Sequence, residues 1–156
     1  MDGCLIPLGR KGFAIVDSED YERAMQYSWV MVPKRRRLYA RREWRIGNRL
    51  RRYEYLHSFI MRSREQIDHR NLDGLDCRKA NLRFATAQQN AANKERRPGG
   101  SSKYKGVYWS KSINRWVARL RTKHLCSSTN EEDAARAYDE AALKMYGEFA
   151  RTNGFV

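Results

Sequence analysis

Four polar residues in the middle of the chain have the types and the spacing of a hydrolytic site. Asp68 and His69 are adjacent, Asn81 follows twelve residues after His69, and Asn90 follows nine residues after Asn81. Carboxylate and side-chain amide oxygens are hard ligands suited to Mg²⁺ or Mn²⁺. An imidazole, with an unperturbed pKa of about 6.5, can accept a proton from water at neutral pH. An Asp-His pair alone is more often structural, so the hypothesis of a metal ion beside a general base depends on the whole set.

The sequence around these residues predicts a strand, a loop, a second strand and a helix. Residues 66–69 and 82–85 have the short pattern of strands, and the segment between them is polar and contains a glycine. A capping-box pattern then begins a helix over 87–97. These elements would place the Asp-His pair on the first strand and Asn90 near the start of the helix.

Upstream of the site, the sequence predicts a β-rich region. Residues 12–17 are expected to form a strand, and the acids that follow favour a helix over 19–29, ended by Pro33. Its buried stripe is expected to consist of Tyr21, Met25 and Trp29, or alternatively of Ala24 and Ser28. Residues 38–56 are expected to form a β-hairpin around a two-residue turn signal. His57 follows the hairpin, where a histidine is more often structural than catalytic.

The predicted hairpin is strongly basic, with ten basic residues and one acid between Lys34 and Arg52. Such a surface can lie along a phosphate backbone or in a groove of DNA. The alternative is a solvated face of a two-layer fold. The candidate DNA contacts here are Arg41, Arg42, Arg45, Arg49 and Arg51.

The last third of the chain predicts a second, smaller sheet packed on one helix. The PGGSS segment at 98–102 has the composition of a linker. Short strands are expected over 104–109, 115–121 and 123–127. In the middle strand, alternation places Arg115, Val117, Arg119 and Arg121 on one face, which is expected to be free and basic, and Trp116, Ala118 and Leu120 on the other. A helix with an alanine-rich stripe follows a capping box at Thr129 and Glu132, and it would cover the apolar face.

Composition narrows the class of partner. The chain has 156 residues, with 32 Lys plus Arg against 18 Asp plus Glu, a net charge of +14. A polyanion would relieve the self-repulsion of such a charge, and nucleic acid fits better than an anionic membrane surface or a merely solvated basic surface. Three dispersed cysteines without a Cys-x-x-Cys pair argue against structural zinc and a disulfide framework. With no signal peptide and no membrane span in the sequence, we expect a cytoplasmic, non-secreted protein without a membrane partner.

The central residues resemble the HNH (ββα-metal) nucleases. Asp68-His69, Asn81 in NLR and Asn90 in QQN carry the match, and the segments IPLGRKGFAIVDSEDYERAMQYSW and YLHSFIM resemble the lead-in of phage-type members. The resemblance implies that His69 is the general base, that Asp68 and Asn90 hold one divalent metal, Mg²⁺ or Mn²⁺, and that Asn81 fixes the loop and orients His69. Asn90 stands where many relatives carry histidine, which bears on metal preference and rate.

Residues 102–153 resemble the Apetala-type (ethylene-response-factor-like) DNA-binding domain through YKGVYW, RWVARLR and AARAYDEAALKMYGEFARTN. The resemblance implies a three-stranded sheet that enters the major groove. Two arginines of the plant first strand are replaced here, and Cys126 stands where a glycine is expected. The DNA contacts carried over by position are Lys105, Tyr108, Lys111, Arg119 and Arg121, and Arg115 joins them by alternation alone.

Together these patterns predict an α+β protein with a nuclease domain over 1–97 (ββα-metal unit about 64–95), a linker over 98–102 and an Apetala-type domain over 103–156. The predicted function is a metal-dependent DNA endonuclease or nickase of the phage, mobile-element or homing type. We expect a monomer that binds double-stranded DNA, needs no small-molecule cofactor, acts in the host cytoplasm if phage-encoded, and cuts one strand at a time. The alternatives are a sequence-selective regulator with an inactive HNH unit and, on charge alone, a structural RNA-binding protein.

Overall fold

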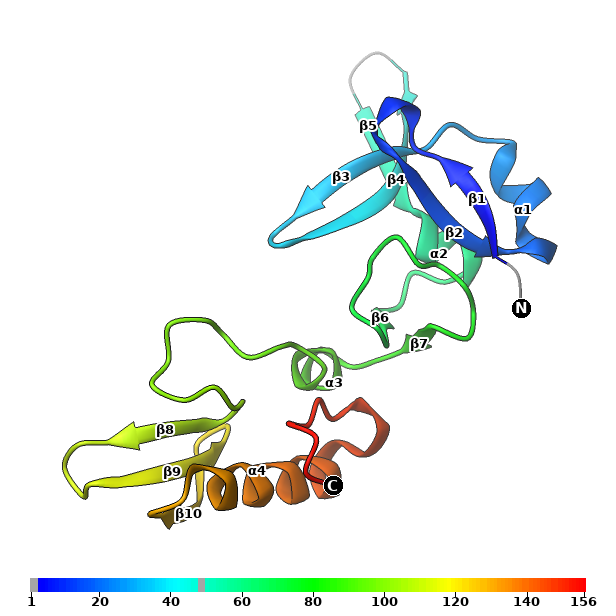
Figure 1. Cartoon of the computed structure of the whole chain (residues 1–156). Coiled ribbons are helices and arrows are strands. Elements are labelled where there is room, and N and C mark those ends of the chain that lie inside the picture. Colours follow the sequence, from blue (N-terminus) through cyan, green and yellow to red (C-terminus); the bar gives the residue numbers. More distant parts are fainter. Residues whose placement is uncertain (1–2, 48–49) are drawn as a thin grey trace. The chain divides into compact units, whose positions relative to one another are not determined.

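The computed structural model describes residues 3–47 and 50–156 (Figure 1). The chain divides into two compact units, Met1–Thr86 and Ala87–Val156. Across the described residues the fold is α+β, with small antiparallel sheets and four α-helices, as the sequence predicted. None of the helices in these ranges is long and apolar enough to cross a membrane.

The first unit begins with an antiparallel pair, β1 (Gly3–Pro7) and β2 (Phe13–Asp17), joined through a short 3₁₀ helix (Gly9–Lys11). The sequence pattern predicted β2 but not β1. Helix α1 (Ser18–Met25) follows and ends earlier than the predicted 19–29. The expected helical stripe was therefore wrong at its end: Trp29 lies beyond the helix, is buried, and donates its indole N–H to the Ala24 carbonyl at 2.8 Å.

The second sheet of this unit has the order β3-β4-β5, with β3 at Val30–Lys34, β4 at Arg37–Ile46 and β5 at Leu50–Tyr55. The hairpin predicted over 38–56 is present as β4 and β5, while Asn48 and Arg49 of its turn lie outside the described residues. The edge strand β3 was not predicted from the sequence. Pro33 can lie in it because proline lacks a backbone N–H, and an edge strand has no neighbour on one side that would need one.

Helix α2 (Leu56–Ile60) follows β5 directly, so His57 lies in a helix rather than at the end of a strand. The core of the unit forms between α1, α2 and the two sheets, where each contributes a few aliphatic side chains and Trp29 provides the large aromatic surface. Fully or almost fully buried members of this core are Ile6, Leu8, Ala14, Val16, Ala24, Ala40, Leu56, Ile60 and Cys77.

A third, two-stranded sheet closes the first unit. Strands β6 (Ile67–His69) and β7 (Leu82–Phe84) pair antiparallel, with His69 opposite Leu82. Helix α3 (Ala87–Ala92) comes next in the chain but belongs to the second unit, where the Ala92 carbonyl accepts from the Arg151 amide at 3.3 Å. The expected order of strand, loop, strand and helix is present, and the closed ββα-metal unit stays a prediction.

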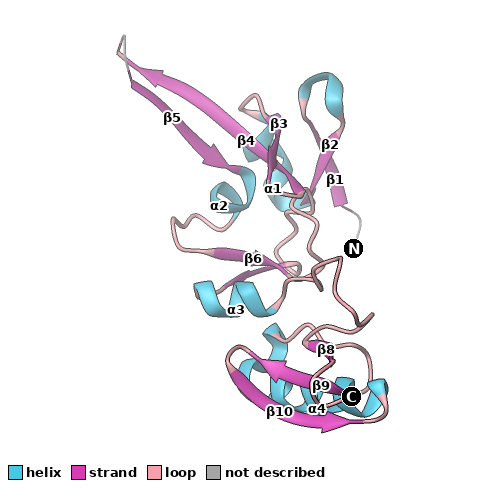
Figure 2. Ribbon diagram, turned by 90° about the vertical axis from the view of Figure 1, so that its left-hand side faces the viewer, coloured by secondary structure: helices cyan, strands magenta, loops and turns pink. Residues whose placement is uncertain are grey.

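The second unit is a three-stranded antiparallel sheet in the order β10-β9-β8, with α4 across one face (Figure 2). The strands are Val107–Ser110, Arg115–Leu120 and Lys123–Ser128, and α4 spans Glu131–Tyr146. Ala134, Ala135 and Ala142 of α4 are buried between the helix and the sheet, so α4 lies close on the sheet as predicted. Its cap differs: the side chain of Asn130, not Thr129, accepts from the Glu132 amide at 2.8 Å.

A close approach between the sheet and the helix explains one glycine. Gly106 precedes β8 with φ +77°, and a Cβ added there would lie 2.0 Å from the ring of Tyr138 on α4. Only a residue without a side chain fits this position, which allows the buried tyrosine to rest against the backbone.

Val117, predicted to lie on the exposed basic face, is instead 3 % exposed.

Candidate active site

His69 lies in a cluster of aromatic and imidazole rings drawn from three elements of the first unit. Its ring is 5.0 Å from that of His57 on α2 and 5.8 Å from that of Tyr39 on β4, measured between centroids. His57 in turn stacks on Tyr55 of β5 at 5.3 Å. Residues from β4, β5, α2 and β6 are therefore brought together around the predicted base.

Burial keeps both imidazoles neutral. His69 is only 4 % exposed, and burial lowers its pKa to about 4 although Asp68, Asp73 and Asp76 act in the opposite direction. Burial likewise lowers the pKa of His57 to about 3, with further contributions from His69 and Lys34. A general base must be unprotonated, and burial provides that form throughout the neutral range. The same shift makes the imidazole a weaker proton acceptor than one whose pKa lies near the working pH.

The loop between β6 and β7 is held by a network centred on Asn81. The Asn81 side chain accepts from the Asn71 amide at 2.9 Å and donates to the Asp76 carbonyl at 2.8 Å. The Asn81 carbonyl accepts from the amide of Arg70, the residue after His69, at 2.9 Å. Asn81 thus ties the segment that leaves His69 to the segment that returns to β7, a geometry suited to orienting the imidazole.

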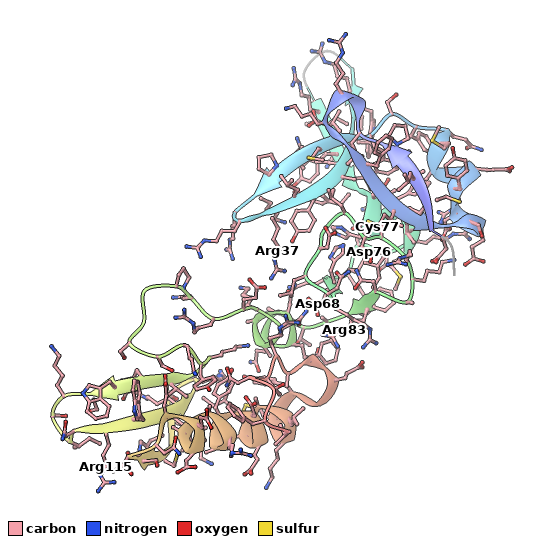
Figure 3. All side chains as sticks on the ribbon, in the orientation of Figure 1. Arg37, Asp68, Asp76, Cys77, Arg83 and Arg115 are labelled. Atoms are coloured by element: carbon pink, nitrogen blue, oxygen red, sulfur yellow. The ribbon has the colours of Figure 1, made fainter. Side chains whose placement is uncertain are left out.

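The loop is also anchored to the first sheet. Ile15 of β2 donates to the Leu75 carbonyl, and the Cys77 amide donates to the Ile15 carbonyl, both at 2.8 Å. The guanidinium of Arg78 binds both oxygens of Asp76 and, as the largest cause, lowers the pKa of that carboxyl. Figure 3 labels Asp76 and Cys77 in this loop, beside β2. The position of His69 is therefore set by backbone and side-chain bonds on both sides of the loop.

Asp68, the predicted metal ligand, forms a buried ion pair with Arg83. The two residues are directly opposite each other on β6 and β7, and Arg83 donates Nε–H and Nη2–H to Oδ2 of Asp68 at 3.0 and 2.8 Å (Figure 3). Asp68 is 2 % exposed and Arg83 8 %. Because neighbouring residues on a strand point to opposite faces, the carboxylate and the His69 ring lie on opposite sides of β6.

The remaining predicted members of this site lie on different units. Asn90 is partly buried on α3 in the second unit, whereas Asp68, His69 and Asn81 are in the first. A joint metal site of Asp68 and Asn90 therefore stays a prediction, as do the catalytic roles of His69 and Asn81.

The hairpin has two chemically different faces, because directly paired residues of antiparallel strands share a face. One face, here called the histidine face, includes the two tyrosines that contact His57 and His69. Its members are Lys34, Arg37, Tyr39, Arg41, Glu43, Arg45, Arg51, Tyr53 and Tyr55. The other, here called the tryptophan face, carries Leu38, Ala40, Arg42, Trp44, Ile46, Leu50, Arg52 and Glu54.

Most of the predicted hairpin contacts share the histidine face. Arg45 and Arg51 are paired across the strands and exposed, and Arg41 lies 5.1 Å above the Tyr53 ring and pairs with Glu43. Arg37, at the start of β4, also lowers the pKa of His69 through its charge (Figure 3). Its effect is smaller than that of burial and opposes that of the nearby acids. A row of cations therefore leads along this face toward the imidazole cluster. Arg49 lies outside the described residues.

Arg42 belongs to the tryptophan face and is already engaged. Its Nε–H donates to Glu54 at 2.9 Å, and its guanidinium lies 3.8 Å from the ring centroid of Tyr27 and 5.0 Å from that of Phe59. Such a guanidinium contributes to packing as much as to surface charge. Alternation along β4 places Arg41 and Arg42 on opposite faces of the hairpin. The basic composition of the hairpin does not by itself tell the two residues apart.

In the second unit, the sheet face opposite α4 carries three of the predicted DNA contacts. Tyr108, Arg115 and Arg119 are exposed there, and Figure 3 shows Arg115 projecting away from the ribbon. Lys111 and Arg121 are exposed in the two turns that join the strands. These side chains form one accessible, cationic surface on the sheet.

Lys105 does not belong to that surface. Its ammonium donates to the Ala92 carbonyl and lies 6.0 Å from the ring of Tyr138. Burial lowers its pKa to about 8, with the charge of Arg151 acting in the same direction and Asp139 against it. The inward orientation argues for a structural role at this position.

A cluster of acids elsewhere in the first unit is filled by a lysine. Asp17, Glu19 and Asp20 bring ligand atoms within 4.8 Å of one another. Lys79 occupies their centre, with its Nζ 3.1 Å from Asp20, a second contact to Glu19, and its amide donating to Asp17 at 2.7 Å. The lysine supplies the positive charge that a metal ion would otherwise provide.

Comparison with known proteins gives a distant likeness over the whole chain. No protein-family model matches the sequence, and no solved structure matches it. Among curated proteins, the chain is similar to a protein described as an uncharacterized HNH endonuclease of Acanthamoeba polyphaga mimivirus. The two are 26 % identical over 159 residues, which cover 96 % of this chain and 79 % of the viral protein. The similarity therefore extends over both units.

Proposed function

We propose that this protein is a metal-dependent DNA endonuclease of the HNH type that hydrolyses phosphodiester bonds. One observation carries the proposal: the basic histidine face of the hairpin leads to His69, which is buried and neutral. The hydrogen bonds of Asn81 hold the loop that follows His69. The likeness to a viral protein described as an HNH endonuclease supports the same reaction class.

The roles follow from the chemistry of phosphodiester hydrolysis. His69 accepts the proton of the attacking water, and Asn81 keeps it in place by tying the two ends of the loop. His57 and Tyr39 hold the imidazole ring from the side, which restricts its orientation. Placing the base before substrate arrives removes part of the entropic cost of the reaction.

The residue types of the two predicted ligands suit one hard divalent cation, Mg²⁺ or Mn²⁺; the two residues lie in different units, and their joint site is part of the proposal. A buried carboxylate on Asp68 and the side-chain amide of Asn90 are oxygen ligands, and two protein ligands leave positions for phosphate oxygens and water. When bound, the ion would supply charge neutralisation at the phosphate. Arg83 already binds one oxygen of the same carboxylate, so the ion would have to share Asp68 with it.

We further propose that duplex DNA lies along the histidine face. Arg41, Arg45 and Arg51 would contact phosphates, and Arg49, which lies outside the described residues, is a further candidate from the sequence. The second unit, which we propose to be an Apetala-type domain, would hold DNA on its exposed sheet face through Tyr108, Arg115 and Arg119, with Lys111 and Arg121 at its turns. Two tethered binding surfaces raise the local concentration of DNA at the site.

One plasmid experiment tests the assignment. Supercoiled plasmid is incubated with the protein and Mg²⁺, Mn²⁺ or chelator, and nicked and linear products are resolved. We expect metal-dependent nicking, loss of nicking in His69→Ala with DNA binding retained, and weaker DNA binding in Arg51→Ala than in Arg52→Ala. Arg52 is the matched control because it carries the same charge on the neighbouring position but on the tryptophan face.

Nicking that is unchanged in His69→Ala would overturn the assignment of the base. Equal effects of the two arginine variants would overturn the assignment of the DNA-binding face. Linear product formed before nicked product accumulates would contradict cutting by a monomer with one site.

The pairing of Asp68 with Arg83 favours a second candidate, a sequence-selective DNA-binding regulator whose HNH unit is inactive. An arginine on the predicted metal ligand supplies the charge that the ion would bring. Sequence-selective binding with no cleavage under any metal would support the regulator and exclude the nuclease.

A further inference from the structure

The tryptophan face of the hairpin borders a cavity that the proposed nuclease chemistry does not use. The cavity has a volume of about 350 Å³ and is lined by Tyr27, Ser28, Arg42, Glu43 and Trp44. It lies in the first unit, between the segment after α1 and the exposed part of β4. Tyr39 and Tyr55, which contact the imidazoles, are on the opposite face of the same strands.

Two aromatic rings at this cavity are exposed. Tyr27 is 44 % exposed and Trp44 42 %. Exposed tryptophan and tyrosine side chains beside one another suit a planar ligand, because each ring presents a flat apolar surface with a polar edge. Ile46 and Leu50, paired across the hairpin on the same face, continue the exposed apolar surface beyond Trp44.

The floor of the cavity is a fixed cation. The guanidinium of Arg42 lies 3.8 Å from the Tyr27 centroid and 5.3 Å from the Trp44 centroid, so both rings border the same small site. Glu54 holds that guanidinium from behind, at 2.9 Å from Nε and 2.6 Å from Nη2. A guanidinium plane fixed between aromatic rings can stack on a base and donate hydrogen bonds to its carbonyl and ring-nitrogen acceptors.

We propose that this cavity binds an unpaired nucleobase of a nucleic-acid strand, by stacking on Trp44 and Tyr27 and by hydrogen bonding to Arg42. The commitment to a nucleobase rests on the two rings beside a guanidinium and on the charge of the surrounding sheet: Trp44 and Arg42 lie on β4, and the segment from Lys34 to Arg52 has ten basic residues and one acid, most of them on the histidine face or in the turns. A polyanion is drawn to that surface, whereas an apolar protein segment gains nothing from its charge. This inference deepens the proposed function by giving the nuclease a site for locally opened or single-stranded DNA.

Binding without cleavage separates this idea from the nuclease assignment. The full-length protein is titrated, in chelator and at fixed salt, into a fluorescent short oligothymidylate, and fluorescence anisotropy gives the affinity. A second titration uses an oligomer of the same length and charge in which every sugar lacks its base. Because no metal is present, the result does not depend on whether the protein cuts DNA.

We expect the parent protein to prefer oligothymidylate, and Trp44→Ala to weaken that binding about tenfold, the effect of losing one base–aromatic stack. Trp44→Ala should leave the affinity for the abasic oligomer unchanged, and Trp44→Phe should retain most of the preference. Phe13→Ala is the matched control, because Phe13 is an exposed aromatic residue of the same unit that lies on β2, outside both faces of the hairpin.

The proposal is overturned if the parent binds both oligomers equally, or if Trp44→Ala weakens both equally. It is also overturned if Phe13→Ala has the same effect as Trp44→Ala, since the preference would then not belong to this cavity. Trp44 is exposed, so its variants should fold; an unchanged urea midpoint establishes this before the titrations. Metal-dependent nicking without any base preference would leave the nuclease assignment standing and remove this site alone.

Discussion

The buried pair of Asp68 and Arg83 makes a sharp prediction about stability and metal binding. Arg83→Gln removes the cation and leaves a carboxylate that is 2 % exposed. The parent pair has two hydrogen bonds, at 3.0 and 2.8 Å, to one oxygen. Removing one member of a buried pair costs about 3–5 kcal/mol, because the other charge remains buried without its partner.

The loss of stability in Arg83→Gln should be confined to the first unit. Hydrogen–deuterium exchange read by mass spectrometry reports each unit separately, and a loss of 3 kcal/mol corresponds to roughly 100-fold faster exchange in the β6–β7 peptides. The double variant Asp68→Asn with Arg83→Gln replaces the ions by two amides and should recover most of the protection. Arg52→Gln, at an exposed position, should change nothing.

The metal provides the second half of the test. In Arg83→Gln, Mn²⁺ no longer shares Asp68 with an arginine and should slow exchange more than it does in the parent. Occupancy at about one hundred times the dissociation constant would add about 2.7 kcal/mol. The double variant lacks the carboxylate and should not respond. Protection that is unchanged in Arg83→Gln would refute the role of the pair, and an equal Mn²⁺ response in the double variant would refute Asp68 as a ligand.

Two further predictions concern stability. His57 has a pKa of 6.5 when unfolded and about 3 when folded, and the pKa of His69 falls to about 4, because burial disfavours each imidazolium. The unfolded chain therefore binds extra protons below pH 6.5, and lowering the pH from 6.5 to 4 should cost about 3 kcal/mol through each histidine; His57→Gln should remove about half of the dependence measured by urea unfolding. Gly106→Ala should destabilise the second unit by more than about 2 kcal/mol, since its Cβ would lie 2.0 Å from the Tyr138 ring. Gly147→Ala has nothing within 4 Å but combines φ +53° with ψ −130°, so backbone strain alone should cost about 1–3 kcal/mol in the same assay.

Sequence patterns predicted the parts of the fold that depend on local periodicity. The β4–β5 hairpin, the three-stranded sheet of the second unit and the alanine stripe of α4 all follow from alternation or a helical repeat. Strands β1 and β3 were missed because their five residues owe their conformation to pairing rather than to a pattern of their own. Trp29 was misplaced because burial after the helix and continuation of the helix give the same apolar spacing.

The candidate site was predictable in its residue types and not in its partners. Asp68 and His69 were identified, but the arginine opposite Asp68 depends on the register of two three-residue strands across a twelve-residue loop. No local signal fixes that register. The neighbours of His69 likewise come from β4 and α2, so Tyr39 and His57 could be joined to the site only by the tertiary fold.

The loop glycine shows how the hairpin and the candidate base are connected. A Cβ at Gly74 would lie 2.4 Å from the Leu38 carbonyl and 2.7 Å from the ring of Tyr39, so the loop after His69 rests directly on β4. Tyr39 contacts His69 on one side and belongs to the histidine face on the other. A phosphate backbone bound along that face would therefore be placed relative to the imidazole by one tyrosine and one strand. The same close contact requires glycine at position 74, because any side chain there would separate the loop from β4 and move the base away from the surface that would present its substrate.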